Sequence, residues 1–296
     1  MHSDFRWVGK SEDGETVTLR KFSGKFNVAP YANAEWLAAN ADKVRVGVVI
    51  DTETTGLNRK TDKVIEIGLR QFRFNRASGE LLDVGAAYSA LQDPGMPLSD
   101  DIKRLTGLSD QDVQGKSIDW AAVGRAMSEA SIVIAHNASF DRPFVDRGCE
   151  ISATKIWGCS LKQIDWARKG YNVAKLEVLS IYHGFYADSH RALSDVDALL
   201  NLITMVDWTS RKTYLSELLA NARRPLTHIA ANRAPFEAKD ILKERGYNWD
   251  AAAKCWHKMV FQEDQAAEIA WMEAAVYKGA FGGRTEEIAI ADNFKS

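Results

Sequence analysis

The chain has 296 residues, of which 46% are hydrophobic and 26% charged, and its formal net charge is −2. These values are ordinary for a globular protein, and the length suits a core domain of about 150–200 residues with appendages. No apolar run reaches the roughly 18 residues that a membrane-spanning helix needs, and the polar N-terminus lacks the apolar stretch of a signal peptide. Three scattered cysteines fit a reduced protein better than a disulfide framework, so we expect a cytoplasmic protein with no membrane partner.

The sequence predicts one large α/β domain over residues 44–207, preceded by an N-terminal appendage over 1–43 that holds a short hairpin and a helix near 33–41. The first core strand is a nearly continuous β-branched run ending at Asp51, which is typical of a buried central strand. A hairpin of two antiparallel strands follows, and strands then alternate with helices, which indicates a mixed sheet. The core strands are expected at 44–50, 63–74, 80–90 and 132–135, and the core helices at 117–129, 139–148, 160–168, 175–183 and 190–206.

The pattern changes near residue 208, where a predicted helical linker over 208–234 begins with a helix at 210–221. A small α+β module is expected over 235–281, and the polar tail over 282–296 is expected to be loose. Within the module the pattern predicts a helix at 235–246 and a second helix at 263–277. Between them it predicts a hairpin, whose two strands are 247–249 and 254–260.

Two acidic residues stand at the end of the first core strand. Asp51 and Glu53 are two positions apart, so the period of a strand turns both carboxylates to the same side. Carboxylates this close repel each other unless a cation lies between them, and hard oxygen ligands select Mg²⁺ or Mn²⁺. Taken alone, such a pair is more often a solvated strand end.

A further carboxylate follows the strand at 132–135. That strand ends at His136 and Asn137, a helix begins near Ser139, and Asp141 falls in its first turn, where negative charge is favoured. Taken alone, Asp141 would be explained by helix stabilisation.

The third group of polar residues opens the helix expected at 190–206. His190 lies at its start and Asp195 a turn and a half inside, so both side chains can point into one cleft. A histidine beside metal-bound water could accept its proton near neutral pH, although a lone histidine is more often a cap or a surface residue. Asp197 is expected to face elsewhere.

Three segments carry a resemblance to a known family, in this order: DTETTGL at Asp51–Leu57, HNASFD at His136–Asp141 and HRALSD at His190–Asp195. Together they resemble the three exonuclease motifs of the DEDDh family, which includes the proofreading epsilon subunit of bacterial DNA polymerase III. The stretch Arg104–Ser109 resembles a family segment between the first two motifs. Any one motif is a weak signal, but the three in order, over about residues 44–207, form a specific one.

The resemblance implies a ribonuclease H-like α/β fold, with a mixed five-stranded sheet flanked by helices, and two Mg²⁺ ions for which Mn²⁺ can substitute. Two cations about 4 Å apart can hold the attacking water and the leaving 3′ oxygen of a phosphodiester. The implied metal ligands are Asp51, Glu53, Asp141 and Asp195, with His190 as general base. By position in the motifs, the residues that would contact the terminal nucleotide are Thr54, Leu57, Asn137 and Phe140. Leu57 would be a wedge against the last base, whereas Phe140 could equally be a residue of the hydrophobic core.

The C-terminal module adds a second candidate contact with nucleic acid. From 211 to 258 the chain carries ten basic and five acidic residues, a net charge of +5. Aromatic rings interleaved with Lys and Arg suit single-stranded nucleic acid, which makes Lys254, Trp256 and Lys258 candidate contacts. Large aromatics equally form the core of a small domain.

The expected function is hydrolysis of phosphodiester bonds from the 3′ end of DNA, with single strands favoured, releasing 5′-nucleoside monophosphates. A 3′→5′ exoribonuclease acting on RNA ends or short RNA is an alternative, because these motifs do not reveal a 2′-hydroxyl contact. An alternative from another class is a non-catalytic nucleic-acid-binding or polymerase-associated subunit, which the complete acidic set disfavours. The expected partner is a nucleic acid with a free 3′ end, and a polymerase or a second copy of the chain remains open.

Overall fold

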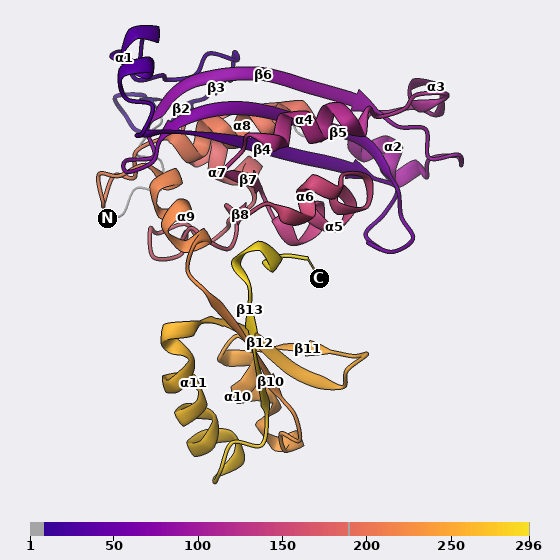
Figure 1. Ribbon diagram of the computed structural model, residues 1–296, viewed down its shortest axis with the longest axis vertical. Helices are drawn as coiled ribbons and strands as arrows, with labels where there is room; N and C mark the ends of the chain where they lie inside the picture. The colour runs from indigo at the N-terminus through magenta and orange to yellow at the C-terminus, as the bar shows by residue number, and fades with distance from the viewer. Residues whose placement is uncertain (1–8, 189, 296) are drawn as a thin grey trace. The chain divides into compact units, whose positions relative to one another are not determined.

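The computed structural model describes residues 9–188 and 190–295, which form two compact units (Figure 1). The first unit runs to Ala222 and includes Phe294, whereas the second runs from Arg223 to Asn293. Within the described residues, no helix is both long enough and apolar enough to cross a membrane. The three cysteines are buried free thiols.

A mixed five-stranded sheet forms the centre of the first unit, with the strand order β6-β5-β4-β7-β8. The central strand β4 pairs antiparallel with β5 and parallel with β7. This arrangement confirms the predicted α/β fold with a mixed sheet. The strands are β4 (Val44–Thr54), β5 (Val64–Asn75), β6 (Leu81–Leu91), β7 (Ile132–Ala135) and β8 (Trp157–Cys159).

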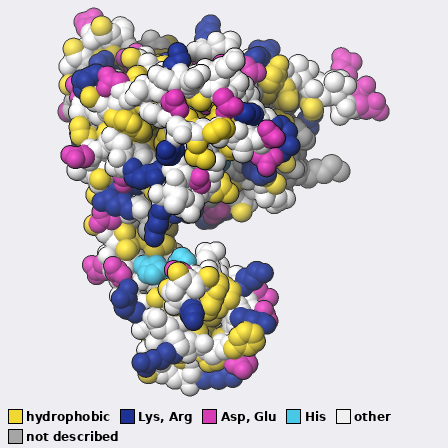
Figure 2. Space-filling model, turned by 90° about the vertical axis from the view of Figure 1, so that its right-hand side faces the viewer, with side chains coloured by type: hydrophobic (Ala, Val, Ile, Leu, Met, Phe, Trp, Pro, Cys, Tyr) yellow, Lys and Arg dark blue, Asp and Glu magenta, His cyan; other side chains and the backbone are white. Residues whose placement is uncertain are grey.

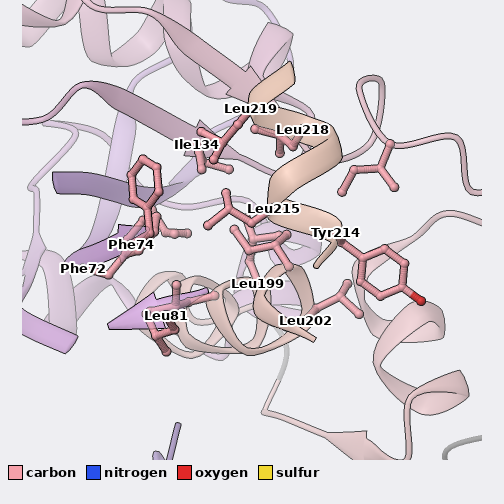
Figure 3. Close-up of a cluster of buried hydrophobic side chains, with 14 of the residues drawn as sticks. Phe72, Phe74, Leu81, Ile134, Leu199, Leu202, Tyr214, Leu215, Leu218 and Leu219 are labelled. Atoms are coloured by element: carbon pink, nitrogen blue, oxygen red, sulfur yellow. The ribbon is translucent and has the colours of Figure 1, made fainter. Parts of the chain in front are cut away.

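Helices cover both faces of this sheet, because alternate residues of the central strands enter two separate cores. Val49 and Ile134 belong to one core, and Val48 and Ile50 to the other. Figure 3 shows the first core, where β5 and β6 side chains such as Phe72 meet leucines of α8 and α9. The helices of the unit are α1 (Ala34–Ala39), α2 (Asp100–Thr106), α3 (Asp110–Val113), α4 (Trp120–Ser128), α5 (Ala138–Gly148), α6 (Glu150–Thr154), α7 (Leu176–Tyr182), α8 (Ala192–Thr204) and α9 (Tyr214–Ala222).

One predicted core helix is wrong. The segment 160–168 consists of turns after β8, which side-chain hydrogen bonds to the backbone hold in place. The Gln163 side-chain oxygen accepts from the Cys159 backbone N–H at 2.8 Å, and the Trp166 indole donates to the Ser160 carbonyl at 2.7 Å.

The N-terminal appendage packs onto the first unit and ends in the expected helix, α1. Its short strands β1 (Gly9–Lys10) and β2 (Val17–Thr18) form the expected hairpin. A third strand, β3 (Arg20–Lys21), pairs parallel with β9 (Phe185–Tyr186), just before α8.

The second unit is a βαββαβ fold whose four-stranded antiparallel sheet has the order β11-β12-β10-β13. The first and last strands of this unit along the chain lie outside the expected module, because β10 falls in the segment expected to be linker and β13 in the tail expected to be loose. The elements are β10 (Leu226–Ala231), α10 (Lys239–Glu244), β11 (Asn248–Asp250), β12 (Cys255–Phe261), α11 (Gln265–Trp271), which continues as a π-helix over Met272–Tyr277, and β13 (Arg284–Ile288).

A glycine on β5 sets how closely α8 approaches the sheet. A Cβ atom at Gly68 would lie 2.5 Å from the backbone of Ala192 and Leu193, so Gly68→Ala must displace the first turn of α8. We expect a loss of about 1–3 kcal/mol in the free energy of unfolding, measured by urea denaturation.

Gly124→Ala in α4 is the matched control. Its Cβ would meet side-chain atoms of Ile151 and Cys149 at 3.5 and 3.6 Å, which is ordinary contact. Alanine is favoured in a helix by about 1 kcal/mol, so this variant should be at least as stable as the parent. Equal stability of Gly68→Ala and the parent protein would contradict the close approach of α8.

Candidate active site

The end of the central strand brings two carboxylates to the α8 side of the sheet. Asp51 and Glu53 follow Val49 at intervals of two, and Val49 lies in the core that α8 closes. Their cross-strand partners on β5 are Gly68 and Glu66. The sequence prediction that the pair shares one side therefore agrees with the strand geometry.

The third carboxylate, Asp141, approaches from the other face of the sheet, on the first turn of α5. It is buried, and its Oδ1 accepts hydrogen bonds from the Thr52 backbone N–H at 3.0 Å and from the Thr52 hydroxyl at 2.8 Å. Thr52 lies between Asp51 and Glu53 and points to the opposite face. One strand end therefore orients carboxylates from both sides of the sheet.

The N-terminal end of α8 supplies the remaining two predicted residues. Asp195 accepts a hydrogen bond through Oδ2 from the backbone N–H of His190 at 2.9 Å. Each of Glu53, His190 and Asp195 offers a ligand atom, and these atoms all lie within 4.8 Å of one another. In the described chain this is the one such group of three, and it unites the first and third sequence motifs.

Burial, together with the crowding of the carboxylates, favours their protonated forms. Burial, together with the charges of Asp141, Asp195 and Glu53, raises the pKa of Asp51 well above its usual value. Burial, and then the charge of Asp195, raises the pKa of Glu53 to about 8. Burial raises the pKa of Asp141 to about 7 against the opposing effect of the Thr52 hydrogen bonds, and burial likewise raises the pKa of Asp195 to about 6. The site therefore holds more negative charge than it can stabilise without a cation.

The motif histidine His136 has a structural role. Its Nδ1 lies 2.8 Å from the Ser160 hydroxyl and its Nε2 lies 2.8 Å from the Ala174 carbonyl. A carbonyl only accepts, so the ring proton is assigned to Nε2. Burial lowers the pKa of His136 to about 4, and the ring stays neutral at physiological pH.

The four predicted nucleotide contacts differ in their exposure. Leu57 is 83% exposed in the loop after β4, as a wedge requires. Thr54 is buried, and its hydroxyl donates to the Gly56 carbonyl at 2.7 Å, which shapes that loop. Asn137 precedes α5 with a φ of 75°, and Phe140 packs against the core beside Phe144, with ring centroids 5.1 Å apart.

Asp197 faces away from the acidic cluster, as predicted. Its two oxygens accept from Arg70 Nε at 2.5 Å and Nη2 at 2.8 Å. This bidentate pair joins α8 to β5, and it explains why an acidic residue two positions from Asp195 is not part of the site.

Sequence reasoning missed Glu66. This buried carboxylate pairs across the strands with Glu53, and its charge contributes to the raised pKa values of Asp51 and Glu53. Arg191 forms an ion pair with it at 3.1 Å. The sequence did hold a signal for Glu66, because it is a charged residue inside the apolar run Val64–Leu69. A glutamate is almost never buried unless it is paired, so its position in a buried strand indicates a partner of opposite charge.

Comparison with known proteins identifies the family. A family model described as Exonuclease matches residues 48–203, which is more than half of the chain and contains all three motifs. The chain belongs to the exonuclease family. With its mixed sheet and acidic set, it is a DnaQ-like member of the DEDD type in the ribonuclease H-like superfamily, a class of hydrolytic enzymes.

The most similar curated relatives include much longer proteins. DNA polymerase III PolC-type from Lacticaseibacillus paracasei is 34% identical over an alignment of 179 residues, which covers 56% of this chain and 12% of the relative. The Clostridium perfringens protein of the same name is 27% identical over an alignment of 199 residues, which covers 62% of this chain and 13% of the relative. The matched region is thus about an eighth of these relatives' length. Among solved structures, E. coli exonuclease I in complex with a dA16 oligonucleotide aligns with a TM-score of 0.48 at 15% identity, covering 73% of this chain and 63% of that one.

The raised pKa values predict how stability depends on pH in the absence of divalent cations. Between the ordinary carboxyl pKa of about 4 and the site values of about 6 to 8, these carboxyls bind more protons in the folded protein than in the unfolded chain. The buried His136 and His183, whose pKa values burial lowers to about 4, oppose this effect below about pH 6.5, where the unfolded histidines are protonated. Stability in EDTA should therefore fall most clearly as pH rises from about 6.5 to about 8. Thermal melting across this range measures the effect, and added Mg²⁺ should reduce the slope.

Asp51→Asn is the matched variant for this measurement. It removes a buried charge that four neighbouring carboxylates also repel, so its melting temperature in EDTA near pH 8 should exceed that of the parent protein. Stability that rises with pH in the parent would contradict the crowding of these carboxylates.

Proposed function

We propose that this protein is a metal-dependent 3′→5′ exonuclease that acts on DNA, with single strands favoured, and releases 5′-nucleoside monophosphates. The observation that carries this proposal is the group of Glu53, His190 and Asp195, whose ligand atoms lie within 4.8 Å of one another. Asp51 and Asp141 add their charge to the same cluster.

The donor set fits divalent cations with a preference for oxygen. Four carboxylates, from Asp51, Glu53, Asp141 and Asp195, would hold two Mg²⁺ ions, and Mn²⁺ would suit the same ligands. Such ions, when bound, supply positive charge to the scissile phosphate and lower the pKa of a bound water. The raised carboxyl pKa values support this assignment, because a bound cation would stabilise the charged carboxylates against the burial and neighbouring charge that raise these values.

The chain's own residues then position the substrate and move the proton. His190 is exposed beside Asp195, and in our proposal its imidazole accepts the proton of the attacking water. Thr52 keeps the Asp141 carboxylate directed toward the strand end through its two hydrogen bonds. Leu57 would wedge against the last base, with Thr54, Asn137 and Phe140 lining the same pocket.

DNA is favoured over RNA because the curated relatives are DNA polymerases, in which the matched region makes up about an eighth of the chain. A 3′→5′ exoribonuclease remains the alternative within the enzyme class. An association with a polymerase is a proposal on the same ground. The complete acidic set disfavours a non-catalytic subunit, since loss of one ligand is the expected mark of an inactive site.

The proposed nucleic-acid contacts of the second unit are not equivalent. Lys254 is exposed in the turn between β11 and β12. Trp256 packs against the unit's own core, and Lys258 pairs with the buried Glu268 at 3.1 Å. On the face drawn in Figure 2, the cationic side chains of this unit are spread among acidic ones. Lys254 is therefore the strongest of the three candidates.

The test is a degradation assay with and without Mg²⁺, on 5′-labelled and 3′-labelled single-stranded DNA, duplex DNA and RNA. Asp51→Ala should abolish nucleotide release, and His190→Ala should reduce kcat by about 100–10,000-fold, the usual contribution of general acid–base catalysis. A ladder of shortened 5′-labelled products identifies cleavage from the 3′ end.

The matched control is Asp197→Asn, which changes an acidic residue of the same helix outside the cluster and should keep its activity. Wild-type rates for purified His190→Ala would exclude the assigned proton acceptor. Faster degradation of RNA than of DNA would favour the exoribonuclease.

A further inference from the structure

His190 has a strained backbone conformation. His190 lies between β9 and α8 with a φ of 64°, in the left-handed region that residues other than glycine rarely occupy. Such a conformation persists only when its surroundings hold it in place. The contacts on either side of His190 therefore bear directly on where its imidazole lies.

The contact on the C-terminal side is made by the buried Glu66. Its carboxylate accepts from Arg191 Nε at 3.2 Å, from Arg191 Nη2 at 3.1 Å and from the Ala192 backbone N–H at 3.4 Å. Arg191 follows His190 directly, and Ala192 is the first residue of α8. Glu66 thus holds both residues that come after the histidine.

The period of β5 explains why this strand can hold α8. Glu66, Gly68 and Arg70 are spaced by two and face the same side. Gly68 lets the backbone of α8 approach closely, and Arg70 binds Asp197 further along the helix. Only the contact made by Glu66 lies next to His190, so the Arg70–Asp197 pair provides an internal comparison.

Glu66 is poorly suited to be a fifth metal ligand. Both of its oxygens accept hydrogen bonds from Arg191, which supplies the compensating positive charge. A buried carboxylate with an arginine partner is already satisfied, and removing either partner would leave an uncompensated charge. Its place beside Glu53 therefore points to a supporting role.

The contact on the N-terminal side of His190 comes from the appendage, which lies outside the region that the family model matches. Backbone N–H groups of β3 and the next residue donate to β9 and the residue before it, from Arg20 to the Gly184 carbonyl at 3.1 Å and from Phe22 to the Tyr186 carbonyl at 2.8 Å. The ring of Phe22 also lies 6.1 Å from that of Phe185.

An ion pair between Lys21 and Asp188, at 2.7 Å, extends this contact toward His190. Both side chains are more than half exposed, so the pair itself contributes little. The backbone pairing and the burial of Phe22 and Phe26 against the core make the larger contribution.

We propose that Glu66 is a positioning residue for His190, acting through Arg191 and Ala192, and that strand β3 is a second anchor of the same segment. The inference rests on the proposed role of His190 as proton acceptor. In this arrangement β5 and the appendage hold the chain on either side of His190, so that the imidazole stays beside Glu53 and Asp195.

The test is a double-mutant cycle on purified full-length protein, with kcat and KM measured on a labelled single-stranded oligonucleotide in Mg²⁺. Glu66→Gln should lower kcat by about 10–100-fold with little change in KM, the usual effect of losing a supporting contact of a metal site. In a His190→Ala background the same change should cause little further loss, because no imidazole is left to position.

Asp197→Asn is the matched control, since it breaks the other ion pair between β5 and α8. It should lower the melting temperature without lowering kcat. Arg191→Gln, at a half-exposed side chain, tests the same anchor if Glu66→Gln does not fold. Full activity of both Glu66→Gln and Arg191→Gln, or losses that multiply with His190→Ala, would overturn the positioning role. Wild-type activity of His190→Ala itself would instead refute the proposed function.

For the N-terminal anchor, Phe22→Ala is compared with Tyr31→Ala. Tyr31 belongs to the same appendage but contacts Trp36 and Glu80 instead of β9. Phe22→Ala should lower kcat by up to roughly 100-fold, which is the loss that a small misplacement of a catalytic group causes. This loss should disappear in the His190→Ala background. Equal kcat values for the two variants would remove β3 from the proposal.

Discussion

The mutual repulsion of carboxylates at the end of β4 is the constraint on which the rest of the structure depends. Asp51, Glu53 and Asp195 are brought together where burial and like charge both oppose ionisation. Such a cluster would relax apart unless its elements were fixed by other contacts. The two cores of the sheet supply that fixation, because α5 and α8 are each packed onto a different face of β4. Stability is thus given up locally to create a site that a divalent cation can complete.

Strand β5 converts this packing into a defined position for α8. Glu66 and Arg70 each bind a residue of the opposite charge on the neighbouring segment, and Gly68 between them leaves room for backbone. A larger side chain at the middle position would push away the helix turn that carries the metal-binding end. At intervals of two residues, β5 therefore supplies the charge of Glu66, the room left by Gly68 and the ion pair of Arg70. None of these three residues needs to touch the substrate.

The sequence could predict the parts of the site that are local. Asp51 and Glu53 share a side because of the strand period, and Asp197 turns away because of the helical period. The pair of Glu66 and Arg191 was not predictable in this way, since 125 positions separate its members and only the antiparallel pairing of β4 with β5 brings Glu66 beside the site. The helix expected at 160–168 was wrong for a related reason, because the buried side chains of Trp166 and Gln163 bond backbone groups of this turn and of β8, contacts that periodicity does not reveal.

The folding unit is larger than the region that family similarity covers. The match ends at residue 203, yet α9 supplies Tyr214, Leu215, Leu218 and Leu219 to the core shown in Figure 3. Phe294 packs against the opposite core, with the Lys162 ammonium 5.9 Å from its ring centroid. The chain therefore leaves this unit after Ala222 and returns to it at Phe294, so the second unit is an insertion with two covalent attachments. A truncation at residue 222 would remove part of the first unit's own packing, and its effect on activity could not be assigned to the second unit alone.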